Sequence, residues 1–419
     1  MEKTPGKNAF LFVLVCVALQ MVAFGIIIPV IPDLLEELTD LPASEAVRWG
    51  GQLTATFAVF NFLFGPLLGN LSDRFGRRPV LLASVATLAL DFFIMGMAQT
   101  VGILFLGRAM AGMSSATFST ANAYVADTTA EEDRGKAFGM IGASFGIGFT
   151  LGPAIGGILG DIDTRLPFFA AGGLCLLNFA YGLLVLPESL KPENRRAFDI
   201  RRANPFGALK HFSKLPKIGW FILAVGTLQF AHIVFPSTWN FYGKIRFGWS
   251  ASEIGWSLVA VGIGSAIVQA GLMGHFIRRL GAPKTAIFGF ITSAVTMMAF
   301  AFSDTPLWVY LIIPISSFAG VAMPAMNAIM TAQTPKNAQG ELQGALASIQ
   351  AFGLIFGPLV MTETLRAFSV EGAPIYFPGS AFVLASILVA TALLPLFAGM
   401  RANGVQLNKK GGPDQAALE

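Results

Sequence analysis

Long apolar stretches separated by short polar turns run along nearly the whole chain. Each stretch is close to the roughly 20 residues that a helix needs to cross a bilayer, and a polar segment at 187–217 divides them into two blocks of six. The pattern predicts an all-α integral membrane protein with twelve transmembrane helices in two six-helix halves. The stretches lie near 8–31, 47–68, 80–99, 101–125, 136–160, 167–186, 218–241, 253–275, 284–302, 306–330, 341–365 and 376–399.

The two blocks repeat each other at a constant offset of 205 residues. Because each block holds an even number of helices, the two blocks have the same orientation in the membrane, as in parallel repeats about an axis along the membrane normal. This predicts pseudo-symmetric halves with a substrate site between them. The matching pairs are Gly69 and Gly274, Gly76 and Gly281, Asn122 and Asn327, Gly135 and Gly340, Gly139 and Gly344, and Gly152-Pro153 and Gly357-Pro358.

Four segments follow from this division. We expect an N-terminal six-helix bundle at 1–186, a cytoplasmic linker at 187–217, a C-terminal six-helix bundle at 218–400 and a cytoplasmic tail at 401–419.

The composition fits a membrane protein, since 54% of the residues are apolar, only 12% are charged and the mean hydropathy is +0.66. Soluble chains carry roughly 25% charged residues, so a soluble domain, a disulfide scaffold and a disordered chain are excluded.

The positions of the basic residues predict the topology. With the N-terminus inside and the first apolar run retained as a helix, 22 of the 28 Lys and Arg residues fall in cytoplasmic segments, so we expect both termini in the cytoplasm. The bilayer's anionic leaflet is then the partner of this charge, and nucleic acid is not. The basic run in the linker is interpreted as a solvated segment, with a nucleotide or regulator site as the alternative. The exceptions are Arg48, Arg165, Lys244, Arg246 and Arg366 outside, and Arg108 within a helix.

The loop from Gly69 to Pro79 concentrates charge at the inner ends of two predicted helices. Its two glycines permit close helix approach and a tight turn, and its carboxylate is surrounded by three arginines. We expect this cluster to gate the inner face by holding the two bundles together and releasing them. The alternative is that the arginines only set topology, which suffices for Arg74. The gating residues are Gly69, Asp73, Arg74, Gly76, Arg77 and Arg78.

A second motif places small residues at three- and four-residue spacing along the apolar stretch 136–160. Such residues let helices pack backbone to backbone in lipid, and a proline inside the run permits bending. The run is predicted to be a packing seam that also serves as a hinge. Its residues are Gly142, Gly146, Gly152, Pro153, Gly156 and Gly157.

Ionisable residues inside a membrane span are costly and are therefore functional candidates. Asp91 and Arg108 lie at similar depth in consecutive antiparallel stretches, so a pair is expected if their helix faces agree. Desolvation favours the neutral carboxyl while a nearby arginine favours the charged one, so proton uptake can depend on which side the cavity faces. A permanent ion pair that only assists assembly is the alternative. Asp33, at the outer end of 8–31, is a secondary candidate for proton coupling.

Several uncharged polar residues are expected to line the substrate cavity. The spans place Gln20, Gln229 and His232 near the midplane, and a structural hydrogen bond between helices is an equal alternative for His232. The remaining cavity candidates lie in facing spans and are Asn61, Trp239, Asn240 and Gln350.

The loop at 69–79 closely resembles the signature of the major facilitator superfamily, and its SDRFGRRPVLL run is similar to that of the bacterial tetracycline efflux pumps. The run 142–157 is similar to the helix-five motif of the drug–proton antiporter branch. Weaker matches to the same pumps are RFGW at 246–249 and LQG at 342–344. The resemblance covers nearly the whole chain and implies the major facilitator fold, with alternating access and export by proton antiport. It also implies that Asp91 is a coupling or substrate residue and Arg108 its partner.

The chain departs from these pumps at three ionisable positions. Gln20 and Ser293 stand where the pumps carry acids, and Ser265 stands where they carry a histidine, whereas Gln269 does match. These departures argue against a magnesium–tetracycline complex as the substrate. They leave Asp91 as the main acid within the membrane.

These observations predict a multi-pass protein of the plasma membrane, the inner membrane of a bacterium. We expect it to export a hydrophobic or amphipathic, drug-like small molecule in exchange for protons, as a monomer. No phosphate-binding GxxxxGK[ST] loop, metal-ligand spacing or catalytic triad is found, so no cofactor, metal or enzymatic activity is expected. The alternatives are a proton-coupled or facilitative transporter of another metabolite and, more remotely, an intramembrane enzyme using Asp91 with His232, or a sensor.

Overall fold

The computed structural model describes residues 7–115, 117–199 and 218–406, and within these ranges every regular element is helical. The longer elements are α1 (Lys7–Ile27), α2 (Ile31–Thr39), α3 (Ala43–Phe75), α4 (Arg77–Gly96), α5 (Val101–Ser114), α6 (Thr117–Thr128), α7 (Arg134–Ile162), α8 (Leu166–Val185), α9 (Gly219–His232), α10 (Val234–Phe247), α11 (Ala251–Ala266), η5 (Ile267–Leu272), α12 (Met273–Ala301), α13 (Pro306–Ser317), η6 (Phe318–Val321), α14 (Ala322–Ala332), α15 (Gln339–Ala367) and α16 (Ser380–Ala402).

The helices account for all twelve predicted stretches. Among the described residues, nine helical runs are long and apolar enough to cross a bilayer, and the pair α1 and α2, bent by 46°, forms a tenth. The stretch 101–125 is divided between α5 and α6. The run Ala251–Ala301 contains two of the predicted stretches, because its backbone leaves the helical conformation at Gly281. Twelve transmembrane segments in two sets of six are therefore present.

The breaks within the helices follow the sequence repeat. The chain is interrupted between α1 and α2 at Ile28–Val30, and between α9 and α10 at Ile233, 205 residues after Ile28. Similarly, α5 ends before Ser115, and the 3₁₀ turn η6 lies 205 residues further on, between α13 and α14. The first and fourth spans of each half are thus both broken, so the repeat extends to local backbone geometry.

The two turns at the end of the molecule that the topology predicts to be cytoplasmic, called the inner end from here on and the opposite end the outer end, are equivalent as well. Gly76, between α3 and α4, has φ 108°, and Gly281, its partner in the repeat, has φ 75°. Side chains with a Cβ rarely adopt positive φ, whereas glycine does so readily. The repeat therefore preserves glycine where the chain must reverse between the second and third spans of each half.

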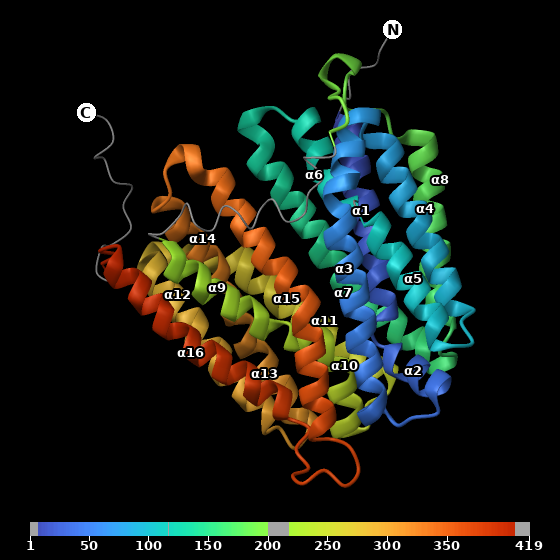
Figure 1. Ribbon diagram of the computed structural model, residues 1–419, viewed down its shortest axis with the longest axis vertical. Coiled ribbons are helices and arrows are strands. Elements are labelled where there is room, and N and C mark those ends of the chain that lie inside the picture. The colour runs from blue at the N-terminus through green and yellow to red at the C-terminus, as the bar shows by residue number, and fades with distance from the viewer. Residues whose placement is uncertain (1–6, 116, 200–217, 407–419) are drawn as a thin grey trace.

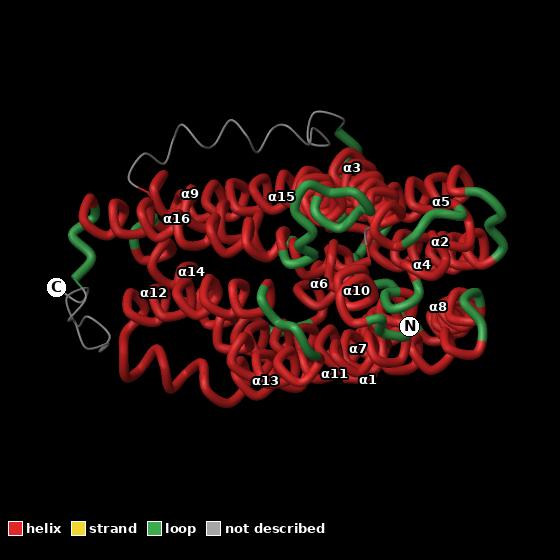
Figure 2. The backbone as a smooth tube through the Cα atoms, turned by 90° about the horizontal axis from the view of Figure 1, so that it is seen from below, coloured by secondary structure: helices red, strands yellow, loops and turns green. Residues whose placement is uncertain are grey.

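The elements form two bundles that meet at one end and diverge at the other. Helices α1–α8 make up one bundle and α9–α16 the other, and they lie closest around α2 and α10, away from the two termini (Figure 1). Across the interface α7 packs against α11, and α3 packs against α15 and α10. The view from below shows the same two pairings, with α7 beside α11 and α3 beside α15 (Figure 2).

The outer surface of both bundles is apolar. Leu177 and Leu184 on α8 are 68% and 84% exposed, and Leu394 on α16 is 71% exposed. Helices satisfy their own backbone hydrogen bonds and can therefore lie in lipid. Apolar side chains on their outer faces are favourable there. Of the predicted linker, residues 187–199 belong to the described chain. The predicted linker residues from 200 to 217 and the tail from 407 to 419 lie outside it.

Candidate functional site

Asp91 and Arg108 meet inside the N-terminal bundle. Asp91 on α4 is completely buried, and its Oδ2 forms an ion pair with the Arg108 guanidinium on α5. Gly107 makes room for the carboxylate, because a Cβ at that position would lie 2.5 Å from Asp91 Oδ1. The guanidinium carbon also lies 6.0 Å from the centre of the Phe57 ring, within reach of a cation–π interaction. The structure thus brings together the two residues that the sequence places at equal depth.

The ion pair between Asp91 and Arg108 leaves part of the hydrogen-bonding capacity of both side chains unused. Among the described residues, Asp91 Oδ1 and Arg108 Nε have no hydrogen-bond partner. Removing one partner of a buried ion pair leaves an uncompensated charge, which is strongly destabilising. A loss of charge on either residue would therefore leave its partner buried and uncompensated.

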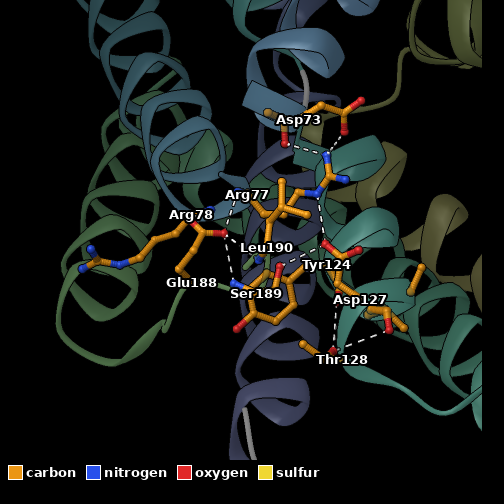
Figure 3. A network of polar contacts seen from close by, with 12 residues as sticks. Asp73, Arg77, Arg78, Tyr124, Asp127, Thr128, Glu188, Ser189 and Leu190 are labelled. Carbon is orange, nitrogen blue, oxygen red and sulfur yellow. Dashed lines mark hydrogen bonds and ion pairs between the residues drawn. The ribbon is translucent and has the colours of Figure 1, made fainter. Parts of the chain in front are cut away.

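The charged loop at the inner end forms a network around Arg77 (Figure 3). The guanidinium donates to Asp73 Oδ1 at 2.6 Å and, through Nε, to Asp127 Oδ2 on α6 at 3.1 Å. Arg78 Nη2 donates to the carbonyl of Leu183 at 2.7 Å. Arg74 takes no part in this network and lies over the ring of Phe75.

Glu188, the second residue of the predicted linker, completes the network (Figure 3). Its Oε1 accepts hydrogen bonds from the backbone N–H of Arg77 at 2.8 Å and of Ser189 and Leu190 at 3.0 Å, and its Oε2 accepts from the N–H of Arg78 at 3.2 Å. A carboxylate at the start of α4 satisfies free N–H groups and interacts favourably with the helix dipole. Sequence reasoning missed Glu188, because its partners at the start of α4 lie more than 100 residues away.

The prediction that this cluster holds the two bundles together is not met in this conformation. Among the described residues, the hydrogen bonds of this cluster given above are made inside the N-terminal bundle or to residues 187–199. The two bundles diverge at this end of the molecule (Figure 1). Gly69 also differs from expectation, since a Cβ there would meet no described atom within 4 Å, whereas Gly76 does form the tight turn.

The small-residue run of α7 divides into a packed and an unpacked part. A Cβ on Gly152 would lie 2.6 Å from Gly25 Cα on α1, and one on Gly157 would lie 2.6 Å from the carbonyl oxygen of Ala251 on α11. Gly156 packs equally closely on α1 at Ile26, and Pro153 packs on both helices. At Gly142 and Gly146 a Cβ would meet no described atom within 4 Å, so the seam covers only the end where the halves meet.

A cavity of about 320 Å³ opens beside the interface, mainly in the C-terminal bundle. Three of the predicted cavity residues line it, namely His232, Trp239 and Asn240. His232 Nε2 forms a hydrogen bond of 2.7 Å with Ser293 Oγ on α12, and Trp239 Nε1 donates to Ser257 Oγ on α11 at 2.9 Å.

The other predicted cavity residues do not line this cavity. Gln20 is buried inside the N-terminal bundle, Asn61 and Gln229 are half-buried, and Gln269 and Gln350 are exposed. Gln269 was predicted from its match to the tetracycline pumps and the others from their positions in the spans, but helix rotation determines which side chains of a given depth face the cavity.

Contacts between the halves gather at the outer end. Lys244 on α10 forms ion pairs with both Asp33 and Glu36 on α2. Asn240 Nδ2 donates to the carbonyl of Ile28 at 3.0 Å, and Asp161 at the end of α7 accepts from the N–H of Ser252 at 3.2 Å. Asp33 therefore lies in a bridge between the halves. No local pattern indicated its partner, because Lys244 was expected only as one of the basic residues outside the cytoplasmic segments.

Comparison with known proteins places these features in a family. The sequence profile of the Major Facilitator Superfamily matches residues 13–246 and again 237–414. The class C tetracycline resistance protein of Escherichia coli is 37% identical over 86% of this chain and 91% of its own. Multidrug resistance protein 1 of Bacillus subtilis is 29% identical over 86% and 90%. The fold matches a crystal structure of a mutant form of the nucleoside transporter NupG with a TM-score of 0.76, at 15% identity, covering 94% of this chain and 99% of that one.

Proposed function

This chain belongs to the major facilitator superfamily, and from that membership we propose that it exports a hydrophobic or amphipathic drug-like molecule in exchange for protons. The tetracycline and multidrug resistance relatives, matched over most of both chains, support drug efflux. The observation that carries the coupling is the completely buried Asp91 carboxylate held by Arg108. We propose further that the protein is a transporter rather than an enzyme. It acts as a monomer in the plasma membrane, with both termini in the cytoplasm.

In the proposed cycle Asp91 carries the proton and Arg108 controls when it binds. The arginine stabilises the charged carboxylate, and burial opposes it. A rearrangement of the N-terminal bundle that draws Arg108 away favours protonation, and its return expels the proton. Moving one charge through 100 mV supplies about 2.3 kcal/mol, before any pH gradient is counted.

The two ends of the molecule act as gates in the same cycle. In the conformation described the bundles are joined at the outer end, where Lys244 bridges to α2, and they diverge at the inner end (Figure 1). When the outer end opens and the inner end closes, we propose that the network of Asp73 with Arg77 and Arg78 becomes the contact between the halves. The packed glycines at 152, 156 and 157, with Pro153, then serve as the hinge.

The coupling is tested in proteoliposomes with an imposed pH gradient, using a drug-like substrate chosen from a susceptibility panel in an efflux-deficient host. We expect Asp91→Asn to lose gradient-driven accumulation by about 100-fold, within the range of losing a positioned proton-transfer group, while still equilibrating substrate. Undiminished accumulation in this variant would contradict the coupling. Gradient-independent equilibration by the unchanged protein would instead indicate a facilitator.

A second variant separates coupling from assembly. If the pair only assists folding, Asp91→Asn combined with Arg108→Gln removes both charges, relieves the unpaired arginine and restores gradient-driven transport. If Asp91 carries the proton, the double variant regains thermal stability but remains uncoupled. Matched measurements of melting temperature and transport on the single and double variants distinguish the two.

A further inference from the structure

Neither a carboxylate nor a lysine or arginine lines the described part of the cavity in the C-terminal bundle, and His232 is its one titratable group. Its polar side-chain groups are hydroxyls, one imidazole, one indole N–H and one amide, and the hydroxyls include those of Ser265 and Ser293.

The apolar part of the cavity is a fixed aromatic frame. Trp239 and Phe300 meet edge to face with ring centres 5.1 Å apart, and Phe235 meets Phe300 at 5.9 Å in the same manner. The indole is held by its hydrogen bond to Ser257. Edge-to-face pairs are favourable and restrict ring rotation, so these walls are already formed before a ligand enters. The volume is in the range of sites that take a small organic ligand.

Three of the polar groups come from two neighbouring segments, the end of α9 and the second half of α12. His232 Nε2 and Ser293 Oγ share a hydrogen bond of 2.7 Å, and Thr296 lies one turn from Ser293 on α12. The Thr296 hydroxyl is bonded to the carbonyl of Thr292 at 2.7 Å, and its oxygen retains acceptor capacity. The cavity thus combines aromatic walls with hydroxyl, imidazole and amide groups that can form hydrogen bonds with a ligand.

We infer that this cavity binds the exported substrate, and that the substrate is an uncharged aromatic compound with hydrogen-bonding groups. The inference rests on the proposed function, since it names the class of molecule exported. An ion entering here loses its hydration with no opposite charge to compensate. Aromatic faces attract cations, but without a carboxylate that attraction alone does not replace the lost hydration. A drug that carries a chelated metal cation likewise finds no anionic side chain among the described residues of the cavity.

The cavity is also coupled to the outer closure. Ile28 and Asn240 both line it and are joined across the two halves by the 3.0 Å hydrogen bond. Opening the outer end separates these two residues and removes part of the cavity wall. A bound ligand therefore leaves the cavity when the outer gate opens, as export requires.

The test is equilibrium binding to the purified full chain in detergent, without any gradient. The probes are chloramphenicol, which is uncharged and aromatic, ethidium, a permanent cation, and tetracycline with Mg²⁺. We expect chloramphenicol to bind at least about tenfold more tightly than the other two, a difference of about 1.4 kcal/mol. Phe235→Leu should weaken its binding by a similar factor. The matched control Phe290→Leu changes a buried ring on the same bundle outside the cavity and should leave binding unchanged.

A second variant tests charge selectivity within one protein. Ser293→Asp places a carboxylate beside His232, and we expect the ratio of ethidium to chloramphenicol affinity to rise by at least about tenfold. This ratio is independent of the folded fraction of the sample. Binding of ethidium or of the magnesium–tetracycline complex as tight as that of chloramphenicol in the unchanged protein, or binding of none of the three, overturns the inference. Chloramphenicol binding without proton-driven export would leave the inference standing and reject the proposed function.

Discussion

Glu188 shows how much one side chain contributes at the inner end of the N-terminal bundle. Its carboxylate accepts four backbone N–H groups, two from the start of α4 and two from its own segment. Gly76 precedes α4 with φ 108°, and a Cβ there would lie 2.6 Å from Glu188 Cδ. The glycine is required both for its backbone conformation and for the space that the carboxylate occupies.

We expect Glu188→Ala to lower the free energy of unfolding by about 1–2 kcal/mol, the upper range for losing a helix N-terminal cap. The measurement is thermal unfolding of the purified protein in detergent. Glu193→Ala is the control from the same segment, because its side chain is 74% exposed and, among the described residues, its ion pair is with Lys191 at 3.9 Å. An equal loss in both variants would show that the carboxylate does not hold α4.

At the scale of elements, α7 connects the two halves through backbone contacts. Its outer half meets α1 of its own bundle and α11 of the other, while its inner half meets neither closely at Gly142 and Gly146. The equivalent helix α15 repeats the arrangement, since a Cβ on Gly51 of α3 would lie 3.0 Å from the carbonyl oxygen of Pro358. Both prolines of the repeat thus lie at a crossing between the halves.

Enlarging a packed glycine should disturb this crossing. We expect Gly157→Val to cost about 1–3 kcal/mol through overpacking, observed as a lower melting temperature together with lost transport. Gly142→Val, on the open part of the same helix, should leave the melting temperature unchanged. If Gly142→Val nevertheless abolishes transport, that glycine packs in the opposite conformation of the cycle. A larger loss of stability at Gly142 than at Gly157 would contradict the seam described.

At the scale of the whole molecule, polar contacts between the halves lie at the outer end of the described structure. Lys244 pairs with two carboxylates of α2, and Asn240 and Asp161 add hydrogen bonds. Partly exposed ion pairs are worth roughly 0.2–1 kcal/mol each. Their sum is enough to bias two conformations that differ by a few kcal/mol, and small enough for transport to overcome.

We expect Lys244→Met to shift the population several-fold toward the outward-open state. Labelling from the outer side of a cysteine introduced at Ile28 measures the shift, and the two natural cysteines are buried. Glu363→Gln is the matched control, because among the described residues its ion pair and hydrogen bonds are made to Arg366, one turn away on the same helix. Unchanged labelling in Lys244→Met would show that the bridge does not determine the conformation.

The local pattern of the sequence was sufficient to predict much of this protein. The length of the apolar stretches predicted the twelve spans, and the 205-residue offset predicted two equivalent halves, because bilayer thickness and helix geometry act within one span. Asp91 and Arg108 were found for the same reason, since depth in consecutive helices can be counted from the chain.

Tertiary structure decided the features that depend on helix rotation and on conformation. Glu188 and Lys244 have partners more than 100 and 200 residues away, and no local pattern points to them. Gln269 and Gln350 lie at plausible positions in the sequence but do not line the cavity described here. Gly142 and Gly157 belong to one motif, yet only the second packs against the other half, because the bundles converge at one end of the helix and diverge at the other.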